Sequence, residues 1–274
     1  MFDKEAIEAL AESASINEAT IALNAAMNGE GAAALPERFR IHDLEGYMPN
    51  RRRARGTMST SVLEDFATYV TINREDGAAV FVDADAMTAN AVLNLGKPTS
   101  PGHADNKAVL KAKMTAAYEA LKAHATGRGL SQASVAEFFE DWTGYFMFFM
   151  EAETIAPSKA IAAVRKITIE SLRKMESEEK SLSASRSTFE NVQATSADPI
   201  PTTIYFKCQP YFGLEDRNFV LRLSVITSGD KPAISLRIVK QEEHDEAMAK
   251  EFAARVEDCL SEEVPVLLGS YATR

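Results

Sequence analysis

Two short segments of the chain carry side chains that could bind a metal ion. Asp83 and Asp85 lie two residues apart at the end of a predicted strand, so both carboxylates are expected on one side of the backbone. His103 and Asp105 repeat this spacing after a loop that two prolines and a glycine constrain. Carboxylates and an imidazole can hold a divalent cation such as Mg²⁺ or Mn²⁺. One hypothesis is therefore a metal-dependent hydrolase or nuclease that uses Asp83, Asp85, His103 and Asp105.

A structural role is open to the same residues. Asp83 and Asp85 can cap a turn and a helix, and His103 can belong to a structured loop without a metal. The chain also lacks a P-loop and the motifs G-x-G-x-x-G, H-E-x-x-H, G-x-S-x-G and C-x-x-C. The sequence thus favours a protein that is not an enzyme, without deciding the question. It predicts no cofactor apart from the divalent cation of the metal hypothesis.

The most basic stretch of the chain offers a second kind of chemistry. It contains Arg51, Arg52, Arg53 and Arg55. Tyr47 precedes it, and Arg38 and Arg40 would extend the patch. Guanidinium contacts to phosphates combined with base stacking hold single-stranded nucleic acid, so these arginines are candidates for binding it. The alternative is a solvated turn, or arginines that pair with carboxylates across a subunit interface.

Composition limits these hypotheses. The net charge is −10, from 30 basic and 40 acidic residues, which excludes a surface that is basic throughout but leaves room for a local basic groove. Cys208 and Cys259 are isolated thiols that suit a reducing compartment. No apolar run approaches the roughly 20 residues that span a bilayer. The first residues include acids where a signal peptide carries bases. We expect a cytoplasmic protein with no membrane partner.

An Ala-rich helix is expected over residues 2–28. Ile7 and Leu10 lie on its apolar side, which needs a partner surface on its own domain or on another subunit. Ser15 and Glu18 form a possible capping box, which would divide the segment near Ser15. A linker over residues 29–36 and a short strand over 39–42 follow.

The middle of the chain alternates between helical and extended patterns. Thr60 or Ser61 could cap a helix that carries Phe66 and Val70. Strands are expected over 78–82, 91–95 and 107–114, and helices over 115–124, from Ser131 onward, and over 158–175. The segment 142–150 is apolar almost all round, which predicts a helix buried on every side and a subunit contact. The predicted oligomer interface comprises Ile7, Leu10, Trp142, Phe146 and Phe149.

The last third of the chain is rich in β patterns. A charged, Ser-rich segment over 176–187 is the best domain boundary. Strands are expected over 188–194, 203–209, 219–227, 233–240 and 264–268, with a hairpin turn at 228–231 and a helix over 242–260. The fold class is α+β, with an N-terminal helical segment, a mixed α/β middle and an antiparallel β-rich C-terminal part with one packed helix. The expected domains are 1–30, 36–182 and 188–274, of which the last two can form one continuous domain.

A set of short motifs resembles a known family. They include Leu35-Pro36-Glu37-Arg38-Phe39, Val80-Phe81-Val82-Asp83, Pro101-Gly102-His103-Ala104-Asp105-Asn106 and Leu130-Ser131-Gln132. Residues 35–145 resemble the YfdQ-like family, uncharacterised proteins encoded by tailed phages and prophages. The resemblance implies a phage origin, a bacterial cytoplasm and a role near phage DNA metabolism or recombination. It carries over no catalytic residues.

These observations lead to one main hypothesis and two alternatives. The main hypothesis is a non-enzymatic, homo-oligomeric phage protein that acts in DNA metabolism or host take-over, with single-stranded DNA as its possible ligand. The first alternative is the metal-dependent hydrolase or nuclease. The second is a phage inhibitor that binds a host protein, for which an acidic surface could imitate the charge of DNA.

Overall fold

The computed structural model describes residues 4–25, 45–150, 153–167, 200–201, 203–226, 233–260, 262 and 264–272. The chain divides into two compact units, residues 1–54 and 55–274. The domain boundaries expected near residues 30–36 and 182–188 lie outside the described residues, as do the expected strands over 39–42 and 188–194 and the turn at 228–231.

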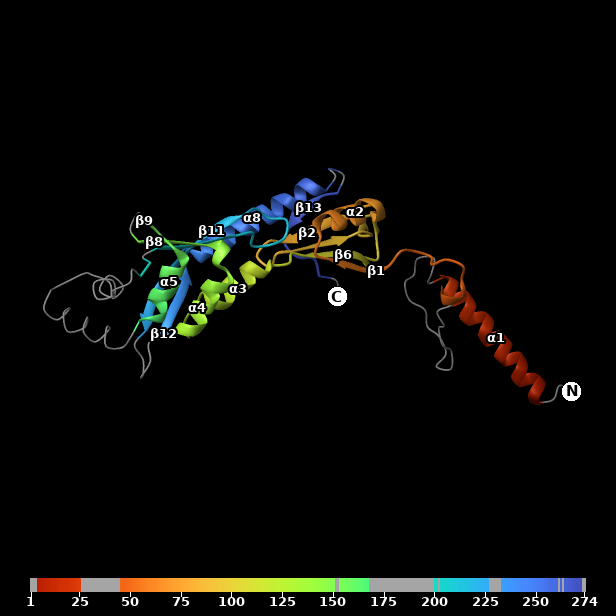
Figure 1. Ribbon diagram of the computed structural model, residues 1–274. Helices are drawn as coiled ribbons and strands as arrows, with labels where there is room; N and C mark the ends of the chain where they lie inside the picture. Colours follow the sequence, from red (N-terminus) through yellow and green to blue (C-terminus); the bar gives the residue numbers. More distant parts are fainter. Residues whose placement is uncertain are drawn as a thin grey trace, which may run out of the picture. The chain divides into compact units, whose positions relative to one another are not determined.

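The first unit contains helix α1 (Lys4–Ala25) and the short 3-10 helix η2 (Glu45–Tyr47). Helix α1 is continuous, as Figure 1 shows, so the predicted break near Ser15 is wrong. The segment is rich in alanine and contains no glycine or proline, and the good helix propensity of alanine outweighs the capping pattern at Ser15.

The second unit begins with a mixed, five-stranded sheet in the order β1-β6-β3-β2-β13. Its strands are β1 (Gly56–Thr60), β2 (Ala79–Asp83), β3 (Thr88–Val92), β6 (Asn106–Lys111) and β13 (Val266–Leu268). The two outer strands run parallel to their neighbours, and the inner pairs are antiparallel. Helix α2 (Leu63–Asn73) packs on β1 and β6 through Phe66 and Val70.

The alternation of side chains gives this sheet two different faces. On β6, Ala108 and Leu110 are buried in the hydrophobic core, while Lys107, Val109 and Lys111 project to the other side. The expected strands over 78–82 and 107–114 are confirmed, with shifts at their ends, whereas the strand expected over 91–95 lies three residues earlier in the chain, as β3 (Thr88–Val92).

A short antiparallel pair, β4 (Gly96–Lys97) with β5 (Ser100–Pro101), also belongs to the second unit. A six-stranded antiparallel sheet in the order β7-β12-β11-β10-β8-β9 completes this unit. Its strands are β7 (Thr126–Ser131), β8 (Phe146–Met150), β9 (Glu153–Ile155), β10 (Thr203–Cys208), β11 (Arg217–Ile226) and β12 (Ala233–Ile238). Helices α3 (Ala116–His124), α4 (Gln132–Asp141) and α5 (Pro157–Arg165) pack along it, and α8 (Gln241–Cys259) reaches α2 (Figure 1). The predicted α+β fold class is confirmed.

The segment 142–150 departs from its prediction. Trp142 ends helix α4, a 3-10 turn covers Thr143–Tyr145, and Phe146 then starts β8 between β10 and β9. The predicted helix is therefore wrong here. Phe146 and Phe148 are buried and Met147 is exposed, a period of two that belongs to a strand. A run that is apolar at every position hides this alternation.

One hydrophobic core joins the five-stranded and the six-stranded sheet. Buried residues of both sheets belong to the same cluster, in which the ring of Tyr118 on α3 stacks on Phe219 of β11 at 5.2 Å. Phe138, Phe146 and Phe206 form an aromatic group with centroid distances between 4.8 and 6.0 Å. Burial of large aromatic surfaces is the main stabilising contribution here.

The loop from Asn94 to Asn106 is held by buried amides and by glycines in close contact. The side chain of Asn94 donates to Asp105 Oδ1 at 2.9 Å and accepts from the backbone of Asn106 at 3.0 Å. A Cβ atom on Gly77 would lie 1.8 Å from the carbonyl oxygen of Gly96. A Cβ atom on Gly96 would in turn lie 2.3 Å from the nitrogen of Gly102. The backbones at these positions can approach only because they are glycine.

Candidate nucleic-acid interface

The face of the five-stranded sheet opposite α2 carries polar and cationic side chains. The strand register sets Ser59, Val109, Asn90, Phe81 and Leu267 in one row across all five strands. Lys107 lies two residues from this row on one side, and Lys111, paired with Thr88, lies two residues away on the other. We call this surface the open face. None of its row residues is fully buried.

An aromatic pair lies at the far side of the open face. The ring of Tyr271 stacks on that of Phe81 with 5.0 Å between centroids and 23° between planes. Tyr271 is exposed, and Phe81 is partly buried. The open face thus has cations on β6 and stacked aromatic rings on β2 and the C-terminal segment, with the amide of Asn90 between them.

Next to Lys111 the open face leads into a cavity of about 610 Å³. We call it the lysine pocket, after Lys111 and Lys113, which line it together with Ser59, Thr60, Ser61 and Glu119. Lys111 and Lys113 are exposed, and neither forms an ion pair with a carboxylate of the described residues. Hydroxyl groups and lysine ammonium groups are donors that suit an anionic ligand.

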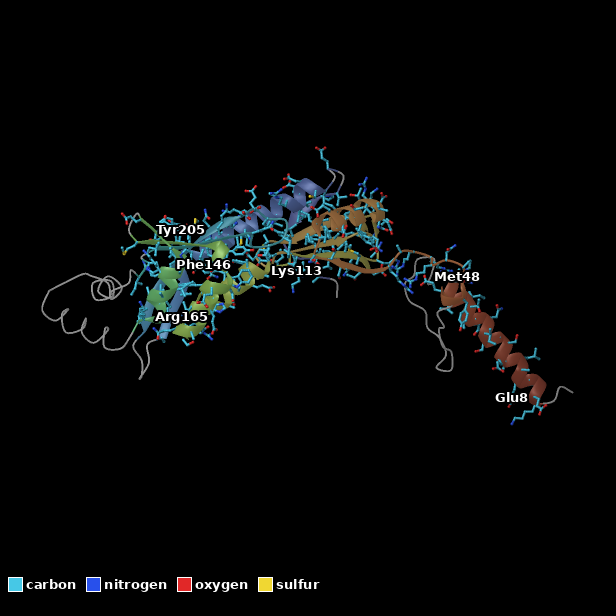
Figure 2. All side chains as sticks on the ribbon, in the orientation of Figure 1. Glu8, Met48, Lys113, Phe146, Arg165 and Tyr205 are labelled. Carbon is cyan, nitrogen blue, oxygen red and sulfur yellow. The ribbon has the colours of Figure 1, made fainter. Side chains whose placement is uncertain are left out.

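An exposed aromatic ring accompanies one of these lysines. The ammonium of Lys113, labelled in Figure 2, lies 5.9 Å from the ring centroid of Phe212, which is 56% exposed. Backbone hydrogen bonds hold this loop in place, because the amide of Phe212 donates to the carbonyl of Lys113 at 3.0 Å. A cation beside an accessible ring is a feature of surfaces that bind single strands.

The arginines predicted from sequence lie where one unit follows the other along the chain. Arg51 and Arg52 are exposed in the first unit, where the backbone amide of Arg52 donates to Glu45 Oε1 at 3.2 Å. Arg53 belongs to the same unit, and Arg55 directly precedes β1. Tyr47 is 90% exposed. Arg38 and Arg40 lie outside the described residues.

The four residues of the predicted cation site do not come together. Asp83 pairs with Thr88 at one end of β3, and Asp105 precedes the other end, where Val92 pairs with Lys107. Four residues of strand separate these ends by roughly 13 Å, which no single ion can bridge. Asp83 accepts from the amide of Ala86 in a turn, and Asp105 holds Asn94. No group of metal-binding side chains occurs among the described residues.

The residues predicted to form an oligomer interface differ in accessibility. Ile7 and Leu10 on α1 are 57% and 62% exposed. Phe146 is buried within the core of its own chain, and Trp142 and Phe149 are only partly exposed. Since Phe146 already packs against Phe138 and Phe206, its side chain has little surface left for another subunit.

The comparison with protein families identifies the chain's relatives. Residues 3–271 match the family model described as an uncharacterized conserved protein, DUF2303. The chain belongs to this family. Neither the curated proteins nor the solved structures contain a match for this DUF2303 chain.

Within the described part of this DUF2303 protein, every helix is too short or too polar to cross a bilayer. The open face could have been anticipated in part from the sequence, because Lys107 and Lys111 alternate with Ala108 and Leu110. Its aromatic pair could not, since Phe81 and Tyr271 meet only through the pairing of β2 with β13.

The two thiols of this DUF2303 protein are expected to react differently. Burial raises the pKa of Cys208 to about 12, and Cys208 is almost inaccessible, whereas Cys259 is exposed. Because the thiolate is the reactive species, a thiol reagent at pH 8 should modify Cys259 in the native protein and both thiols after denaturation. Mass spectrometry of the labelled peptides measures this. Rapid labelling of Cys208 in the native protein would contradict its buried position in β10.

Proposed function

We propose that this protein binds single-stranded DNA on the open face of its five-stranded sheet. The observation that carries the proposal is the combination of cations and stacked aromatic rings on one sheet surface: Lys107 and Lys111 on β6, and Phe81 with Tyr271 across the sheet. Single strands are held by cations that contact phosphates and by aromatic rings that stack with bases.

The overall charge is compatible with such a local surface. The chain carries a net charge of −10, so a strand of DNA is repelled by most of the molecule and attracted where cationic side chains gather. Lys111 and Lys113 have no carboxylate partner among the described residues and are accessible to phosphates. Binding of this kind depends steeply on salt, because phosphate contacts release counterions.

Fluorescence anisotropy with a labelled oligonucleotide tests the proposal on the full chain. We expect binding to single-stranded DNA at low salt that weakens steadily as salt rises, and weaker binding by the variant Tyr271→Ser, which removes a stacking ring. A matched control is Tyr145→Ser, since Tyr145 is also exposed but lies beside Trp142 in the 3-10 turn before β8. Absence of binding at low salt would overturn the proposal.

The arginine-rich segment is itself proposed to bind phosphates of single-stranded DNA. Replacing Arg51, Arg52, Arg53 and Arg55 together with alanine is expected to lower the affinity for single-stranded DNA and to reduce the salt slope by roughly 0.7 for each phosphate that is no longer neutralised. A salt-dependent gel shift measures both effects. If all four replacements leave the affinity unchanged, the segment has no part in binding.

We also propose that α1 mediates self-association. Ile7, Leu10, Ala14 and Ile21 recur at heptad spacing, and Ile7, Leu10 and Ile21 are large apolar side chains that are exposed on α1. Replacing Ile7 and Leu10 with serine is expected to lower the oligomeric mass measured by light scattering. The variant Glu5→Gln is a surface control. A wild-type protein that is monomeric at micromolar concentration would contradict this role.

A place in phage DNA metabolism is part of the same proposal. What supports it is the resemblance of residues 35–145 to proteins encoded by phages and prophages, together with a surface suited to single strands. A homo-oligomer that coats or positions DNA needs no catalytic group, in keeping with the lack of catalytic motifs in the sequence.

A further inference from the structure

A second cavity, of about 430 Å³, adjoins the lysine pocket. Met87 and Tyr211 line both cavities, which therefore adjoin at these two residues. The second cavity is lined by Asp85, Lys122, Glu242, Asp245 and Glu246 and by Tyr118. We call it the carboxylate pocket. The two cavities therefore share one aromatic residue, Tyr211, and the side chains that line them carry opposite net charge, positive in the lysine pocket and negative in the carboxylate pocket.

Backbone contacts hold the loop that carries Tyr211, the residue that both cavities share. Met114 and Tyr211 form a β-bridge, and the hydroxyl of Thr115 donates to the carbonyl of Gln209 at 2.5 Å. The amide of Thr115 donates to the carbonyl of Pro210 at 3.0 Å. The loop that carries Tyr211 is thus tied to the start of α3. Because this loop is held by its backbone, the ring of Tyr211 can stack with a ligand without losing much conformational entropy.

Three of the four carboxylates, those of Glu242, Asp245 and Glu246, come from the first turns of α8. This helix starts at Gln241 after Lys240, whose φ of 55° turns the chain into the helix. The ring of Tyr211 lies 5.8 Å from that of Tyr118. Burial, and after it the negative charge of Asp245, raises the pKa of Tyr118 and of Tyr211. Hydrogen-bond acceptors therefore dominate the carboxylate pocket, and lysines and hydroxyls dominate the lysine pocket.

We propose that the two pockets together bind one nucleotide that carries an amino group on its base. Its phosphate lies against Lys111 and Lys113, its base stacks on Tyr211, and the amino edge of the base faces Glu242, Asp245 and Glu246. The inference rests on the proposed function for the class of ligand, a nucleotide, and adds which bases are preferred.

The chemistry of the bases gives this arrangement its selectivity. Cytosine and adenine present an exocyclic amino group, which donates to a carboxylate, whereas thymine presents a carbonyl oxygen at the corresponding position. A carbonyl oxygen facing carboxylates leaves acceptors opposite acceptors, which is unfavourable. One well-placed contact of this kind discriminates about ten-fold between bases.

The probes are dCMP, dAMP and dTMP, titrated into the full chain by isothermal calorimetry. We expect dCMP and dAMP to bind about ten-fold more tightly than dTMP. Equal affinities for the three nucleotides, tighter binding of dTMP, or no binding of any of them would overturn the inference.

Matched variants separate the two pockets. Glu242→Gln combined with Glu246→Gln is expected to bring the three affinities within about two-fold of one another, because an amide both donates and accepts. Glu257→Gln makes one such replacement elsewhere on α8 and should leave the preference intact. Lys113→Ala should weaken all three nucleotides alike, while Lys159→Ala, on α5, should not. A preference that persists in the double glutamine variant contradicts the role of the carboxylates.

The outcomes also distinguish this inference from the proposed function. A protein that binds an oligonucleotide but does not discriminate the mononucleotides overturns the inference and leaves the open face as the interface. A protein that discriminates the mononucleotides but binds no oligonucleotide supports the inference and overturns the open face as an interface for single-stranded DNA.

Discussion

Replacing Lys111 and Lys113 together with glutamate is expected to weaken binding of single-stranded DNA by roughly 100-fold at low salt. Each lysine that binds a phosphate contributes about 1.5–3 kcal/mol, so removing both costs about 3 kcal/mol or more. Both side chains are exposed and lack carboxylate partners among the described residues, so the change should leave stability almost unaltered. Anisotropy titrations at several salt concentrations measure affinity and salt slope together.

A second pair of lysines provides the control for this experiment. Lys159 on α5 and Lys250 on α8 are also exposed, and their replacement by glutamate changes the net charge by the same amount. If the effect is local, the salt slope falls by roughly 1.4 in the first variant, since single strands release about 0.7 counterion for each neutralised phosphate, and stays unchanged in the control. Equal weakening in both variants would show that only net charge matters and would contradict a defined interface.

The variant Gly77→Ala is expected to lose about 4 kcal/mol or more of its free energy of unfolding. Gly77 has φ of +73°, a region that costs alanine roughly 1–2 kcal/mol. The added Cβ would also lie 1.8 Å from the carbonyl oxygen and 2.6 Å from the carbonyl carbon of Gly96. These are backbone atoms, so relief requires moving the loop away from the sheet, which adds strain of the kind seen on overpacking a core. Urea denaturation followed by circular dichroism gives the value.

Gly144 offers a matched position for the same substitution. A Cβ atom on Gly144 would meet no atom within 4 Å, and its φ is not positive. Gly144→Ala should therefore change the free energy of unfolding by less than about 1 kcal/mol. If Gly77→Ala unfolds at the same urea concentration as the wild-type protein, the close approach of the two glycine backbones has no energetic importance.

Local patterns in the sequence predicted much of the fold. Ser131 was expected to cap a helix, and the amide of Ser134 donates to its hydroxyl at 3.1 Å at the start of α4. The hairpin partners over 219–227 and 233–240 pair as β11 and β12. In these elements the signals in the sequence are a helix cap, turn residues and the alternation of apolar with polar side chains. These signals lie within a few residues of one another and favour the same structure.

Prediction was wrong where the local pattern allowed two structures. The segment 142–150 is apolar at nearly every position, so its period was ambiguous and the pairing of β8 with β10 decided for a strand. The separation of Asp83 from Asp105 follows from the antiparallel pairs β2–β3 and β3–β6, which place the two residues at opposite ends of β3. Register between strands depends on contacts along the whole chain.

The candidate interface, too, was predictable from local patterns only in part. The alternating lysines of β6 are visible in the sequence, and so is the arginine-rich segment before β1. The lysine pocket and the carboxylate pocket are not, because their walls combine β1, β6, α3, α8 and the loop of Tyr211. Only tertiary packing brings the residues of these elements around one aromatic ring.

Strand β13 has a consequence for how the chain folds during its synthesis. Val266 pairs with Val80, and Tyr271 then covers Phe81, so the last strand of the five-stranded sheet leaves the ribosome long after the other four. Until then β2 is an edge strand whose free side can pair with other chains. Assembly of this sheet therefore awaits synthesis of the residues that form β13, and contacts so distant in sequence are slow to form. Nascent chains stalled before residue 266 should be the ones that chaperones hold.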